Sequence, residues 1–204
     1  MKSQTAVAMN RATRNAVVKT GRSGPTGSHT IVCDREVPGL ENVSLSTVVT
    51  SDEEIIAERA MYFDCQGQRD GHAAGGLNSA AESFLFAEEY TADGFDTFLL
   101  LQNPNSKSIN VNVNYTVDPA YGGPHANTHN VPANIRRTVR VDDGLAKAAF
   151  GMTLSADGEF TAERAMYFDY GTSSNGNRIA GGHDACGASG AATAWWFAEG
   201  YTGW

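Results

Sequence analysis

The octapeptide AERAMYFD occurs twice in this chain, at residues 57–64 and again at 162–169. Eight identical residues do not recur by chance in a chain of 204, and the similarity continues beyond them. Downstream, FLFAEEYTADGF at 84–95 matches WWFAEGYTGW at 195–204. The offset between the copies is therefore 105 residues at the first block, from 57 to 162, and 111 at the second, from 86 to 197. A period of about 100 residues is that of an immunoglobulin-like domain, above the 20–50 residues of solenoid repeats. The repeat predicts domains in tandem.

The apolar residues follow a two-residue period, which is typical of β-strands. In INVNVNYTV (109–117), β-branched and aromatic residues alternate with asparagines, as in a half-buried strand. FDTFLLLQNPN predicts a strand that ends in an Asn-Pro turn, and IRRTVRV predicts one with Val139 and Val141 inward. The segment from Phe150 to Tyr170 predicts two strands flanking a turn at Asp157-Gly158. No stretch of helix length has helical periodicity, so we expect an all-β fold of immunoglobulin-like antiparallel β-sandwiches.

The repeat also predicts domain boundaries. Residues 29–83 match the back half of a unit, 84–194 form a complete unit, and 195–204 are the opening strand of a further unit. A long glycine-rich loop is expected between Tyr170 and Ala194. Units that break after each octapeptide instead would shift these boundaries, and the sequence leaves that phase open.

Charge and cysteine content exclude several functions. Residues 1–28 hold five basic residues and no acid, and we expect a disordered basic arm there. The other residues hold 10 basic and 23 acidic side chains, a net charge of −13, which argues against nucleic acid as a partner. No apolar stretch is long enough for a transmembrane helix, and the first 20 residues lack the apolar core of a signal peptide. The three cysteines have neither zinc-site nor disulfide-framework spacing.

Five motifs together carry a resemblance to a known class of repeats. FAEEYT, FDTFLLLQNPN, INVNVNYTV, VPANIRRTV and AERAMYFD resemble the tandem β-sandwich repeats of large bacterial cell-surface and secreted proteins, over most of residues 29–204. The resemblance implies a non-catalytic structural or adhesive segment located outside the cell. Its implied partners are neighbouring repeats and a cell-surface protein or glycan. It implies no catalytic or binding residues and no cofactor.

The repeated acidic and basic pair of the octapeptide is the first chemical candidate. Glu58-Arg59 and Glu163-Arg164 contain carboxylates of the kind that glycosidases use. Adjacent residues of a strand point to opposite faces, however, so each pair cannot form one site alone. We therefore expect ion pairs with a cross-strand partner or at a domain junction.

The histidines form no convincing metal or catalytic set. His125 and His129 are expected in a loop, and on a strand they would lie roughly 13 Å apart, too far to share an ion. His183, Asp184 and Cys186 could supply metal ligands or a nucleophile. The first copy has His72 before its Gly-Gly and no cysteine, so we interpret this set as not shared between the copies. The sequence predicts no catalytic, cofactor-binding or metal-binding residue.

Aromatic residues at the C-terminal end are the candidates for a binding surface. Trp195, Trp196, Tyr201 and Trp204 could contact a glycan or a protein interface, so a glycan-binding module is the alternative function. Phe84, Leu85 and Phe86 occupy the matching positions in the earlier segment at 84–95, which favours packing, and we expect at least one of Trp195 and Trp196 to be buried.

The same C-terminal segment, residues 195–204, is expected to need a partner strand. An unpaired strand rich in aromatic residues promotes association, so we expect it to pack back onto the preceding domain or to add to another chain. Residues 29–83 are a possible acceptor, because they lack an opening strand of their own.

Overall fold

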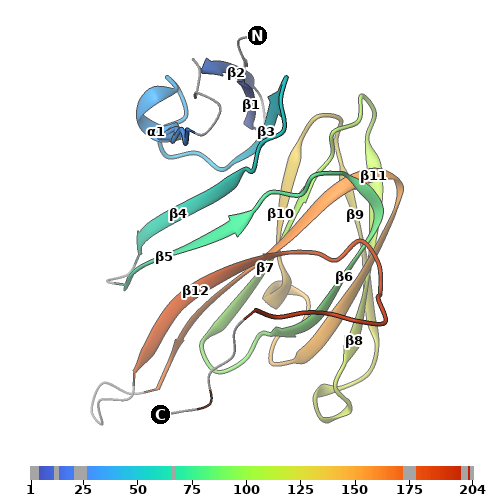
Figure 1. The fold of residues 1–204 in the computed structure, drawn as a ribbon. Helices are drawn as coiled ribbons and strands as arrows, with labels where there is room; N and C mark the ends of the chain where they lie inside the picture. Colours follow the sequence, from blue (N-terminus) through green and yellow to red (C-terminus); the bar gives the residue numbers. More distant parts are fainter. Residues whose placement is uncertain are drawn as a thin grey trace.

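The chain folds almost entirely into antiparallel β-sheet (Figure 1). The computed structural model describes residues 5–11, 14–20, 27–65, 68–171, 178–198 and 202. Every strand pair among these residues is antiparallel. The expectation of an all-β fold is confirmed. Among the described helices, none is long and apolar enough to cross a membrane.

The second copy of the repeat forms a seven-stranded sheet with the order β10-β7-β11-β8-β9, in which β6 and β12 also pair with β11. Its strands are β6 (Ala81–Tyr90), β7 (Phe95–Gln102), β8 (Ile109–Val117), β9 (His125–Val131), β10 (Arg136–Arg140), β11 (Ala149–Tyr170) and β12 (Ile179–Cys186), with the short 3-10 helices η1 (Pro119–Tyr121) and η2 (Val141–Asp143). Residues 179–186 are therefore a strand, where a continuous glycine-rich loop was expected, because β11 supplies a full ladder of partners.

The long strand β11 continues through the expected turn at Asp157-Gly158, with a register shift in its pairing with β6 between Ser155 and Phe160. Its first half pairs with β6 and β8, and its second half pairs with β7 and β12. Asp157 accepts a hydrogen bond from the backbone N–H of Asn110 at 2.8 Å. A side chain at position 158 would come within 3.0 Å of Ile109 Cγ2, so glycine permits this close approach. The hairpin prediction is wrong, because strand partners on both sides outweigh the local turn preference of Asp-Gly.

One buried cluster fills the interior of the second copy. Ile109, Val111 and Val113 of β8 are fully buried while the intervening asparagines are exposed, which confirms the predicted alternation. Phe84 of β6 packs edge-on against Phe160 of β11, with ring centroids 5.1 Å apart. Asn103, after β7, is buried, and its amide nitrogen lies 2.9 Å from the Val131 carbonyl. This core packs the seven-stranded sheet, against which the β4–β5 hairpin of the first copy lies.

The first copy forms two smaller sheets. They contain β1 (Thr5–Arg11), β2 (Arg14–Thr20), β3 (Leu45–Ser51), β4 (Glu58–Cys65) and β5 (Gln68–Gly75), with the short helix α1 (Cys33–Glu36). The orders are β2-β1-β3 and β4-β5. Residues 5–11 and 14–20 thus form a hairpin where a disordered arm was expected. Within this segment β2 pairs with β1, and β1 also pairs with β3, at least 34 residues further along the chain (Arg11 with Leu45), a partner that the local composition does not reveal.

The two copies share one strand plan. β3 corresponds to the first half of β11, β4 to its second half, and β5 to β12. The hairpin β1–β2 occupies the place of β8–β9: Val49 pairs with Val7, and Leu154, which is 105 residues after Val49, pairs with Val113. The strands of residues 5–75 therefore repeat the arrangement of β8, β9, β11 and β12, while β10 has no counterpart among the described residues of the first copy.

Candidate functional site

The repeated octapeptide forms one strand of a hairpin in each copy, and the hairpins have the same register. Met61 lies opposite His72 in β4–β5, and Met166 lies opposite His183 where β11 pairs with β12. His72 and His183 are therefore equivalent, because an offset of 111 residues brings GHAAG at 71–75 onto GHDAC at 182–186. Ala73 and Gly75 stand at the positions of Asp184 and Cys186, so the set as a whole is not shared between the copies, as the sequence predicts.

The first hairpin packs onto the second through a charged cluster. Arg59 of β4 donates to Glu163 of β11 at 2.7 Å and to Asp184 of β12 at 2.6 Å. The Asp184 side chain is only 1% exposed, so Arg59 neutralises a carboxylate that is almost removed from water. The ion pair expected from the octapeptide is confirmed, and it joins the two copies.

Aromatic contacts extend the junction along the same strands. Phe63 of β4 meets Tyr167 of β11 edge to face, with centroids 5.3 Å apart. The Tyr167 hydroxyl lies 3.4 Å from His72 Nε2. Burial lowers the pKa of His72, which favours the neutral ring in this contact. Tyr167 also packs against Phe98 of β7.

Small residues let the hairpins approach each other closely. The Gly182 N–H donates to Asp70 at 3.1 Å, and the Cys186 thiol donates to the Gly75 carbonyl at 3.1 Å. A Cβ at position 182 would lie 2.7 Å from the Tyr167 ring and 3.3 Å from Phe63. Burial raises the pKa of the Cys186 thiol, which disfavours the thiolate that a nucleophile needs.

A second ion pair occupies the opposite face of β11. Arg164 donates to Glu89 of β6 at 2.9 Å and lies 2.7 Å from His183 Nδ1. Glu89 is fully buried, and burial raises its pKa to about 7 despite the nearby arginine. Burial, followed by the charge of Arg164, lowers the pKa of His183. Strand alternation thus directs Glu163 and Arg164 into different contacts, as the sequence predicts.

The set formed by His183, Asp184 and Cys186 does not converge on one point. His183 lies on the Arg164 face, whereas Asp184 contacts Arg59 on the other face. Within the described ranges, no group of three or more His, Cys, Asp or Glu side chains is arranged to hold a metal ion. Asp184 and Cys186 instead contact Arg59 and Gly75 of the first hairpin, so they belong to the junction between the copies.

The two remaining candidate histidines lie on a strand. His125 and His129 belong to β9, so their assignment to a loop is wrong, because β8 pairs with the whole Gly-Pro-flanked segment. Both side chains are half-buried on one face of β9. Burial, followed by the charge of Arg137, lowers the pKa of His129.

The C-terminal aromatic residues are exposed. Trp195, Trp196 and Phe197 are 60%, 90% and 87% exposed, so the expectation that one tryptophan is buried is wrong. Their counterparts Phe84 and Phe86 are buried because β6 pairs with β11, a pairing that no described strand provides for residues 195–198. The other two candidates, Tyr201 and Trp204, lie outside the described residues.

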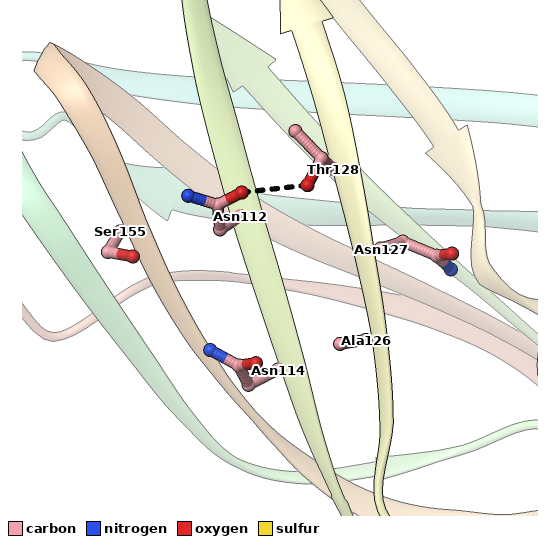
Figure 2. Close-up of a pocket in the computed structure, with 6 residues that line it drawn as sticks. All are labelled: Asn112, Asn114, Ala126, Asn127, Thr128 and Ser155. Atoms are coloured by element: carbon pink, nitrogen blue, oxygen red, sulfur yellow. Dashed lines mark hydrogen bonds between the residues drawn. The ribbon is translucent and has the colours of Figure 1, made fainter.

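A polar hollow that the sequence reasoning missed lies on the outer face of β8, β9 and β11 (Figure 2). It is lined by Asn112, Asn114, Ala126, Asn127, Thr128 and Ser155. The Thr128 hydroxyl donates to the Asn112 amide oxygen at 2.7 Å. The asparagines at successive outward positions of β8 were the available clue, but they also fit a simple solvated face.

Comparison with known proteins adds only distant structural likenesses. No family model matches the sequence, and no curated protein matches it. The solved structure of Thermotoga maritima 1070 is similar with a TM-score of 0.46 and 10% identity, over 55% of this chain and 96% of that chain. The Anabaena sensory rhodopsin transducer is similar with a TM-score of 0.36 and 17% identity, over 44% and 86%. At these scores neither likeness bears on function.

Proposed function

We propose that this chain is a non-catalytic structural or adhesive segment of an extracellular bacterial surface protein, built from repeated immunoglobulin-like β-sandwich units. The observation that carries the proposal is the contact of Arg59 with Glu163 and Asp184. One charged residue from each copy of the motif, Arg59 and Glu163, takes part in this contact, which supports a role of the motif in joining one unit to the next.

The junction joins unlike faces of the two hairpins. The Arg59 face of the first hairpin meets the Glu163 face of the second, so the contact is head to tail. The equivalent arginine of the second hairpin, Arg164, is bound to Glu89 within its own copy, so the contact is described for this one junction. Such packing stiffens a chain of domains, which suits a stalk or a surface-display segment.

Force measurement on a single molecule tests the structural role. When the chain is pulled by its two ends, we expect the β4–β5 hairpin and the second copy to unfold together in one event. Arg59→Ala should separate this event into two at lower force, and Arg69→Ala, which alters an exposed ion pair within β4–β5, should not. Independent release of the hairpin in the unchanged protein would contradict the proposal. So would hydrolysis of esters, glycosides or peptides that Glu163→Gln abolishes.

Glycan binding is the second candidate function, and the exposure of Trp195 and Trp196 favours it. Exposed indole rings stack on sugar faces. A glycan array followed by titration of tryptophan fluorescence tests this idea. Saturable binding that Trp196→Ala removes, and that Ile56→Ala leaves intact, would favour the glycan-binding module. Ile56 is a suitable control because it is 93% exposed and lies outside the aromatic segment.

A further inference from the structure

The strand β3 lacks the neighbour that its counterpart has. In the second copy, residues 150–156 of β11 lie between β8 and β6. In the first copy, β3 has β1 on one side, in the place of β8, and stands at the edge of its sheet. On its other side, no described strand pairs with residues 45–49. Val48 and Val49 are 42% and 37% exposed there.

The chain carries a second version of the missing neighbour at its other end. Residues 83–86 of β6 read SFLF, and residues 194–197, which are 111 positions later, read AWWF. Phe84 and Phe86 are 0% and 7% exposed in β6, but the equivalent Trp195 and Phe197 are 60% and 87% exposed. Figure 1 places this segment away from β3 of the same molecule. An edge strand, open at residues 45–49, and a segment whose sequence matches the missing neighbour therefore occur in one chain.

We propose that residues 195–198 of one molecule add to residues 46–49 of β3 in a second copy as an antiparallel strand, in the place that β6 occupies beside β11. The internal repeat defines the register. Leu154 pairs with Phe84 and Met152 pairs with Phe86, so Val49 is opposite Trp195 and Thr47 is opposite Phe197. The partner is a second copy of this chain, and the inference does not depend on the proposed function.

Two physical effects drive this addition. The backbone groups at a strand edge gain ladder hydrogen bonds, as in other cases of β-strand addition. The contiguous aromatic surface of Trp195, Trp196 and Phe197 is removed from water on the first copy of the partner. We call the added C-terminal segment the donor and the edge strand β3 the acceptor. The donor and the acceptor lie on different parts of the molecule, so the interface is heterologous and adds molecules head to tail.

Solution mass as a function of concentration tests the proposal on the full chain. Phe197→Lys alters the donor, and the double variant Thr47→Lys/Val49→Lys alters the acceptor. Ile56→Lys, at another exposed position, is the matched control. We expect the unchanged protein and the control to associate, and each altered protein to associate at least about tenfold more weakly. Phe197 is 87% exposed, so its replacement leaves the fold of the monomer unaffected.

Mixing the two altered proteins distinguishes a donor–acceptor interface from simple aromatic stickiness. The Phe197→Lys molecule keeps its acceptor and the Thr47→Lys/Val49→Lys molecule keeps its donor, so an equimolar mixture should form a dimer with one interface. All three tryptophans lie within residues 195–204, so their emission should shift to the blue as the dimer forms. A monomeric unchanged protein, undiminished association of Phe197→Lys, or a mixture that stays monomeric would each overturn the proposal. If the double variant does not fold, the Phe197→Lys result decides the question.

Discussion

Arg59 and Glu163 lie 2.7 Å apart, and they are neighbouring positions of two identical octapeptides from the two copies of the repeat. The equivalent of Arg59 in the second copy, Arg164, turns away from this junction and contacts buried Glu89. The same eight residues thus form a joint between copies with one face and a core contact with the other. Strand alternation makes this double use possible.

The first prediction concerns the free energy contributed by the joint. Arg59→Ala leaves the Asp184 carboxylate without its charged partner, so the free energy of unfolding should fall by about 1–2 kcal/mol, a range reduced because Arg59 is partly exposed. Urea denaturation measures it. Arg69→Ala, which removes a largely exposed pair with Asp64, should change the same quantity by less than about 0.5 kcal/mol. Equal effects of the two substitutions would refute a structural role for the junction.

The second prediction uses a matched pair of residues from the repeat. Tyr62 and Tyr167 hold the same position of the octapeptide, but Tyr62 is 85% exposed while Tyr167 packs against Phe63 and Phe98. Tyr167→Ala should lower the midpoint of thermal unfolding, at a cost of about 2–3 kcal/mol, and Tyr62→Ala should cost less than about 0.5 kcal/mol. If the two variants have the same midpoint of thermal unfolding, Tyr167 is not packed between the copies as described.

The third prediction follows from the buried carboxyl group of Glu89. Burial raises its pKa to about 7 from the ordinary 4.5, so between these pH values the folded protein holds a proton that the unfolded chain has lost. This group should therefore make the free energy of unfolding decrease as the pH rises from 4.5 to 7, by about 3 kcal/mol in total. Chemical denaturation across this range should show that Glu89→Gln removes the decrease.

The adjacent exposed residue provides the control for that measurement. Glu88→Gln deletes the same kind of charge at the surface, so its pH curve should still contain the contribution of Glu89. A Glu89→Gln protein with the same pH dependence as the unchanged protein would show that this carboxyl group has an ordinary pKa.

The fourth prediction concerns the turn between β6 and β7. Gly94 has a φ of +89°, and a Cβ there would lie 2.2 Å from the Asp169 carbonyl oxygen. Gly94→Ala should lower the free energy of unfolding by about 2–3 kcal/mol through backbone strain and this clash. Gly123→Ala, where a Cβ meets no atom within 4 Å, should change it by less than about 1 kcal/mol. Differential scanning calorimetry compares the two, and a fully stable Gly94→Ala protein would contradict the turn geometry.

Local patterns were sufficient for several strands. The alternation in residues 109–117 predicted the buried and exposed faces of β8 residue by residue, because a side-chain period of two is a property of the extended backbone itself. The same alternation directs the Glu and Arg of each pair to opposite faces of a strand, so the sequence predicted that they form ion pairs with residues of other strands. Asp157-Gly158 failed as a turn because its strand has partners on both sides, which a local window does not contain.

The amino-acid sequence was enough to establish the repeat, the all-β class and the alternating faces of the strands, since each depends on residues close together in the chain or on identity between copies. Tertiary structure alone decided which face of each copy is covered. Tyr62 and Tyr167 have identical sequence surroundings, yet only Tyr167 lies under another hairpin. Trp195 is likewise exposed where Phe84 is buried. Burial depends on neighbours supplied by distant segments, and two copies of one motif differ in those neighbours even when their residues agree.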